Sequence, residues 1–122
     1  MFFTYYQNNS GGRSKGSHYV IIEARDYRDA NNLAEDKAEI YFNGCAEGFD
    51  CNCCGDRWIP YSFDGFQTMK GTGVPCLYKV PIIAFTDEGV AERAEREISV
   101  YYLDGTVKIF NIIKDRFDSA VV

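Results

Sequence analysis

The residues with the most evident chemistry are four clustered cysteines, Cys45, Cys51, Cys53 and Cys54. They belong to the stretch NGCAEGFDCNCCGDRW at 43–58, which is rich in thiols and has no helical or strand periodicity. Such a stretch needs either a metal ion or disulfides to hold it. In a cytoplasm thiols stay reduced, so clustered cysteines there more often bind metal or do redox chemistry.

The segment Cys51-Asn-Cys53-Cys54-Gly55 contains a CxxC pair followed by glycine, which is typical of a zinc knuckle. The glycine permits the tight reversal of such a turn. Structural zinc takes four ligands, and the second pair is not written as another CxxC. We predict a Zn²⁺ site formed by Cys45, Cys51, Cys54 and Cys76, with His18 and Cys53 as substitute ligands.

A redox alternative uses the same pair, because Cys51 and Cys54 could cycle between dithiol and disulfide. A redox CxxC usually begins a helix, whereas Pro60 follows closely here. No Glu or His is placed as a general base beside the cysteines, so we predict no catalytic residues. The sequence favours a protein that is not an enzyme without excluding one.

Two further motifs carry weaker signals. Arg57 and Trp58 follow the cysteines and are of the types that dominate protein-binding hot spots, although a lone Trp in a small domain more often packs in the core. The loop Asn8–Ser17 combines glycines with Arg13 and Lys15, which would suit a phosphate. It leads into a strand and matches no phosphate-loop spacing, so a plain hairpin loop is the simpler interpretation.

Strands and one helix must position these residues. Residues 2–7 and 18–24 predict a β-hairpin. Asp26 predicts an N-cap for a helix over 27–42, with a buried stripe and Gly44 as its C-cap; the stripe comprises Ala30, Leu33, Ala34, Ala38 and Tyr41.

The second half is predicted to be mostly strands. Short strands are expected at 58–63 and 77–85, and a short helix capped by Thr86 at 87–95. Asp104-Gly105 between 98–103 and 106–113 predicts a two-residue hairpin with a type I′ turn. Residues 114–122 are predicted to fray.

Together these elements predict one α+β domain over residues 1–122, a mostly antiparallel sheet packed by one long helix, with the cysteine-rich loop at 43–58 after that helix. The net charge of −5 and the absence of a basic run disfavour nucleic-acid binding. No apolar run has the length of a membrane span or a signal peptide. The sequence leaves a homo-oligomer open.

Three blocks, MFFTYYQNNSGG at the start, SHYVIIEA at 17–24 and FNG…DCNCCGDRW across 42–58, resemble a family of small proteins from tailed bacteriophages. The resemblance carries no activity and no functional residue. It implies an accessory protein that acts in the host bacterial cytoplasm, where such proteins often bind and redirect a host factor.

We therefore predict a non-enzymatic phage accessory protein that binds and modulates a host bacterial protein. The binding surface would be supported by the zinc-stabilised loop, with Arg57 and Trp58 as contact residues. The alternatives are a thiol redox protein that uses Cys51 and Cys54, and a small-ligand or nucleotide-binding protein that uses the glycine-rich loop.

Overall fold

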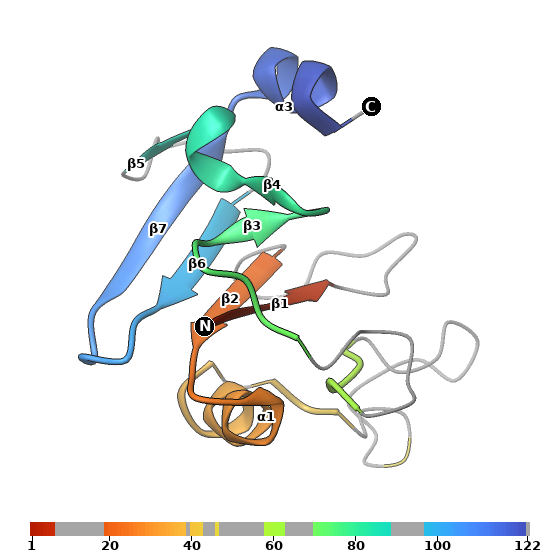
Figure 1. The fold of residues 1–122 in the computed structure, drawn as a ribbon, viewed down its shortest axis with the longest axis vertical. Helices are drawn as coiled ribbons and strands as arrows, with labels where there is room; N and C mark the ends of the chain where they lie inside the picture. The colour runs from red at the N-terminus through yellow and green to blue at the C-terminus, as the bar shows by residue number, and fades with distance from the viewer. Residues whose placement is uncertain are drawn as a thin grey trace.

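The structure is a computed structural model that describes residues 1–6, 19–38, 40–42, 46, 58–62, 70–88 and 97–121. The described part has an α+β fold with two helices and a mostly antiparallel main sheet (Figure 1). Its elements are β1 (Phe2–Tyr6), β2 (Tyr19–Glu23), α1 (Tyr27–Lys37), β3 (Cys76–Leu77), β4 (Val80–Pro81), the 3-10 helix η1 (Ile82–Ala84), β5 (Thr86–Glu88), β6 (Glu97–Tyr101), β7 (Val107–Ile112) and α3 (Lys114–Val121).

The main sheet has five strands in the order β1-β2-β6-β7-β5. β1 and β2 pair antiparallel, which confirms the predicted N-terminal hairpin. β6 pairs antiparallel with β7, and β7 with β5. The pair β2–β6 is parallel, so the sheet is mixed at its centre. The small antiparallel sheet β3–β4 lies outside the main one.

Each face of the main sheet has its own core because neighbouring side chains of a strand point to opposite faces. In β2, Val20 and Ile22 pack against α1, in a cluster that includes Ala30 and Ala34. Ile21 points the other way, into a second cluster with residues of β3, η1, β6 and α3. Figure 1 shows the resulting layers, with α1 on one side of the sheet and β3, β4, η1 and α3 on the other.

Helix α1 begins as predicted but ends early. The Asp26 side chain accepts from the backbone N–H of Asp29 at 2.8 Å, which confirms the N-cap. The helix was predicted to reach about residue 42, yet it ends at Lys37. The N–H groups of Ala38 and Ile40 both donate to the Ala34 carbonyl, which turns the chain so that Ile40 is buried. The predicted burial of Tyr41 is wrong, since its side chain is exposed, and Gly44 lies outside the described residues.

The prediction of one continuous strand over 77–85 is wrong, because this run forms two short strands and a 3-10 turn. The chain reverses at Tyr78 and Lys79, then continues through β4 into the 3-10 turn η1. Pro81 stands at the start of that turn, where its fixed φ suits a change of direction. The predicted helix 87–95 is also wrong at its start, because Thr86–Glu88 forms strand β5; its later residues lie outside the described part.

The C-terminal hairpin is confirmed, with a different turn. The N–H of Gly105 donates to the carbonyl of Tyr102, and the N–H of Tyr102 donates to the carbonyl of Thr106. Only Gly105 has positive φ there, so the loop has three residues and a glycine bulge instead of a type I′ turn. Two other predictions are wrong: residues 58–62 form no strand, and the tail forms helix α3, anchored by Phe117 against Phe85.

Neither α1 nor α3 is long and apolar enough to cross a membrane, and no other helix of the described residues is either.

Candidate functional site

Most of the predicted metal ligands lie outside the described residues; these are His18, Cys45, Cys51, Cys53 and Cys54. Cys76, the remaining one, is the first residue of β3 and is buried. Its thiol lies 3.3 Å from the carbonyl oxygen of Val74 and donates to it. The described ranges contain no group of three potential metal ligands. The zinc site therefore stays a prediction.

Of the predicted contact residues Arg57 and Trp58, the structure describes only Trp58. Arg57 lies outside the described residues. Trp58 is 8% exposed and belongs to the core cluster on the α1 side of the sheet. That burial matches the interpretation of Trp58 as a core residue and leaves little of its ring for a partner, while a role for the pair in binding stays a prediction.

The segment that follows Trp58 is fixed beside α1 by a polar side chain of that helix. The Asn31 amide donates to the Tyr61 carbonyl at 2.8 Å, and its oxygen accepts from the Tyr61 N–H at 3.0 Å. The same oxygen accepts from the Tyr5 hydroxyl at 2.8 Å. Asn31 thus holds an irregular segment against the sheet where no strand pairing is available.

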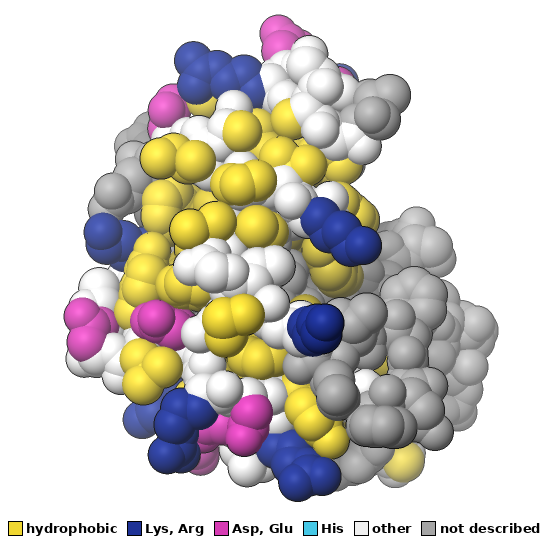
Figure 2. Space-filling view, viewed as in Figure 1, with side chains coloured by type: hydrophobic (Ala, Val, Ile, Leu, Met, Phe, Trp, Pro, Cys, Tyr) yellow, Lys and Arg dark blue, Asp and Glu magenta, His cyan; other side chains and the backbone are white. Residues whose placement is uncertain are grey.

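An apolar surface is exposed on the opposite layer of the fold. It is formed around β3, β4 and η1 by Val74, Tyr78, Pro81 and Ile83, which we call the hairpin surface. Ile83 is 84% exposed and Tyr78 is 52% exposed. Figure 2 shows hydrophobic side chains gathered over these elements. Large apolar side chains in a group on the surface commonly mark an interaction site.

The tip of this hairpin has an unusual backbone conformation. Tyr78 and Lys79 have φ of 49° and 67°, and no other described non-glycine residue has positive φ. A type I′ turn requires positive φ at both central residues, and Asn or Gly normally supplies it. Residues in this conformation persist only where surrounding contacts enforce it, and they cluster at functional sites.

Tyr6 supplies contacts that enforce the turn. Its hydroxyl accepts from the Tyr78 N–H at 2.8 Å, and the two rings pack in a tilted arrangement with their centroids 5.0 Å apart. Burial raises the pKa of Tyr6 to about 12, although the hydrogen bond from Tyr78 opposes this rise. The Tyr6 hydroxyl therefore stays neutral at ordinary pH. Its hydrogen bond and ring contact hold Tyr78 in a fixed position.

The base of the hairpin surface is equally well held. The Ile82 N–H donates to the Pro75 carbonyl at 2.9 Å, which joins the two ends of the hairpin beside Val74 and Ile83. The buried Thr86 hydroxyl donates to the Ile82 carbonyl at 2.7 Å. The exposed side chains thus stand on a pre-formed support, which lowers the entropic cost of binding.

Sequence reasoning missed this surface because LYKVPIIAF at 77–85 is apolar apart from Lys79, and a mostly apolar run of this length is typical of a buried strand. The available signal was Pro81, which stands before two isoleucines. In the short η1 turn only Ile82 faces the core, so Ile83 faces solvent.

Residues 1–117 match the family described as a domain of unknown function, DUF7296, and the chain belongs to that family. No curated protein and no solved structure matches the chain.

Proposed function

We propose that this chain is a non-enzymatic binding domain that docks on another protein through the hairpin surface. The observation that carries the proposal is the exposure of Tyr78 in a strained, well-supported turn and of Ile83 at the base of the same hairpin. A fold gains nothing by leaving so much of an isoleucine in water, where burial would be worth about 1.5–3 kcal/mol. A partner that covers Ile83 recovers that energy.

The chemistry of the surface suits a protein partner. Tyr78 offers a rigid ring with a polar tip, and tyrosine is enriched at energetic centres of interfaces. The neighbouring Lys79 gives a cation at the rim, where a charge steers association more than it adds affinity. The strained turn would keep both side chains presented without an ordering step on binding.

For the identity of the partner, we propose a host bacterial protein met in the host cytoplasm, with the chain acting as a phage accessory protein. The basis is the resemblance of the N-terminal blocks and of the cysteine stretch to phage proteins. Binding of this kind would modulate the partner by occupying one of its surfaces, which needs no catalytic group.

The test is an affinity capture from bacterial lysate with matched variants of the full chain. Ile83→Asp and Tyr78→Ala should lose the captured protein, because each removes an apolar contact from the hairpin surface. Tyr41→Asp places the same charge on another exposed residue with an apolar ring, outside the hairpin surface, and should keep the captured protein. Melting temperatures confirm that each variant is folded. Capture that survives both hairpin variants would overturn the proposal.

We also propose that Zn²⁺ stabilises the cysteine stretch through Cys45, Cys51 and Cys54. A thiolate ligand cannot donate a hydrogen bond, so the contact of Cys76 with Val74 favours His18 or Cys53 over Cys76 as the fourth ligand. The test is metal content after purification without chelator. Zinc should be lost in Cys51→Ser and retained in Cys76→Ser.

A metal-free wild type would contradict the zinc proposal. If Cys51 and Cys54 then formed a reversible disulfide, the thiol redox alternative would gain support. The hairpin proposal is tested separately, since its variants leave every cysteine in place.

A further inference from the structure

Helix α3 packs beside the hairpin surface, next to Tyr78. The Phe117 ring lies edge-on to the buried Phe85 ring, with their centroids 5.1 Å apart, and its centroid lies 6.4 Å from that of Tyr78. Phe117 and Val121 are half-buried against the core cluster on this side of the sheet, and no described residue of α3 is fully buried. Figure 1 shows α3 beside the η1 turn, which carries the exposed Ile83.

The contacts that hold α3 in place are apolar. Its N-cap position is taken by Ile113, whose carbonyl accepts from the Phe117 N–H at 2.9 Å. The Ile113 side chain has no oxygen that could accept from the free N–H groups of the first turn. The polar side chains of α3 make no hydrogen bond and no ion pair with the described residues; these are Lys114, Asp115, Arg116, Asp118 and Ser119.

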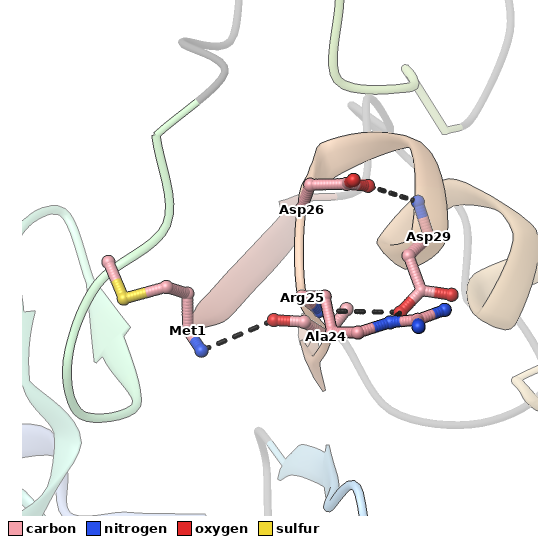
Figure 3. A network of polar contacts seen from close by, with 5 residues as sticks. All are labelled: Met1, Ala24, Arg25, Asp26 and Asp29. Carbon is pink, nitrogen blue, oxygen red and sulfur yellow. Dashed lines mark hydrogen bonds and ion pairs between the residues drawn. The ribbon is translucent and has the colours of Figure 1, made fainter.

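Helix α1 is held by polar contacts that α3 lacks. Asp26 caps its first turn, and Asp29 Oδ2 accepts from the N–H of Arg25 at 3.3 Å and from its Nε at 3.4 Å (Figure 3). Asn31 joins the same helix to the backbone of Tyr61. The two helices of the described part therefore differ in how firmly they are attached to the sheet.

The stability of α3 depends on its docking. It has eight residues, and isolated helices shorter than about 12–15 residues are marginal in water because the first turn is costly to form. The chain directly before α3 is fixed, since the Ile113 N–H donates to the Phe85 carbonyl at 2.8 Å. Opening would therefore begin at Lys114 and leave β7 in the sheet. Segments with few buried contacts are the ones that open locally.

We propose that α3 is an autoinhibitory strap that closes over one end of the docking surface and that a partner protein displaces. This inference rests on the proposed function of the hairpin surface. In the closed form Phe117 occupies the position against Tyr78 and Phe85 that an apolar side chain of the partner takes in the complex. Release of α3 adds the Phe85 ring to the surface. Because the open form is the one that binds, the apparent affinity is proportional to the fraction of open molecules.

Amide hydrogen exchange of the full chain tests whether α3 opens by itself. The protection factors of residues 117–121 should be lower than those of β2 and β6 by about tenfold or more. They should also change little at urea concentrations that lower the protection of the sheet, because opening of α3 exposes little surface. Equal protection of α3 and the central strands, with the same dependence on urea, would overturn the proposal.

A matched pair of variants changes the stability of α3 without changing its packing. Asp118 is exposed and has no partner among the described residues. Asp118→Ala and Asp118→Gly remove the same charge and differ in helix propensity. The protection factors of α3 should be roughly fivefold lower in the glycine variant than in the alanine variant.

The same pair tests whether the strap covers the docking surface. The probe is the protein of the bacterial lysate whose capture is lost in Ile83→Asp. Asp118→Gly should bind that protein roughly fivefold more tightly than Asp118→Ala does. Equal affinity of the two variants would overturn the regulatory role of α3 and leave the hairpin surface as a docking site. If no captured protein depends on Ile83, the proposed function fails and its regulation by α3 fails with it.

Discussion

The hydroxyl of Tyr61 hydrogen-bonds to both backbone groups of Thr4, accepting from its N–H at 2.8 Å and donating to its carbonyl at 2.9 Å. Thr4 lies in the edge strand β1, where these groups would otherwise lack a ladder partner. Two residues earlier, Phe2 exchanges two bonds of 2.8 Å with the backbone of Thr72. The outer edge of β1 is thus closed by irregular segments, which protects it from pairing with another chain.

Removing that hydroxyl should destabilise the fold. Tyr61→Phe leaves the buried N–H and carbonyl of Thr4 without partners, and each such group costs about 1–3 kcal/mol. We expect the free energy of unfolding to fall by about 2–4 kcal/mol in urea titration. Tyr78→Phe is the control, because the Tyr78 hydroxyl makes no hydrogen bond to the described residues. Equal effects of the two variants would contradict this role of Tyr61.

Alkaline pH should destabilise the protein through its buried tyrosines. Burial raises the pKa of Tyr5 and of Tyr61, and it raises that of Tyr6 from 10.0 to about 12. Above pH 10 the unfolded chain releases these protons while the folded chain retains them. Stability is therefore full below pH 10 and falls as the pH rises toward 12. Urea midpoints across this range measure the fall, and Tyr6→Phe should make it shallower. A midpoint that stays flat up to pH 12 would refute the prediction.

Gly71 and Gly73 form a matched pair for a packing test. A Cβ at Gly71 would lie 2.8 Å from Met1 Cβ and 2.9 Å from the Phe2 carbonyl oxygen, whereas a Cβ at Gly73 meets nothing within 4 Å. Gly71→Ala should lower the free energy of unfolding by about 1–3 kcal/mol because the β1 backbone must shift. Gly73→Ala should leave it unchanged or raise it by up to about 1 kcal/mol. The reverse order would show that residue 71 does not pack on β1 as described.

Removing the glycine of the β6–β7 turn should destabilise the protein, whereas introducing a glycine into the β3–β4 turn should stabilise it. Gly105 has φ of 92° with open space around it, so Gly105→Ala should destabilise by about 1 kcal/mol through backbone strain alone. Lys79 has φ of 67°, so Lys79→Gly should stabilise by about 0.5–1 kcal/mol. Thermal melting of both variants measures the difference. A loss of stability in Lys79→Gly would mean that the lysine side chain supports the turn.

The sequence alone determined those elements that depend only on residues a few positions apart in the chain. The β-branched run Tyr19–Glu23 formed a strand, and Asp26 capped the helix, because both depend on neighbours a few residues away. The hairpin at Gly105 followed from one residue that tolerates positive φ. Fold class followed as well, since these elements must bury one face each.

Tertiary structure alone decided how distant segments meet. The parallel pairing of β2 with β6 joins residues such as Ile21 and Val100, and no local pattern encodes that choice of neighbour. The same holds for Leu33 and Leu103, which form opposite walls of one groove. In the run 77–85 every apolar residue carried the same local signal, yet Leu77 and Phe85 are buried and Ile83 is exposed. Which of them faces solvent is fixed by packing between layers, a non-local term that sequence periodicity does not contain.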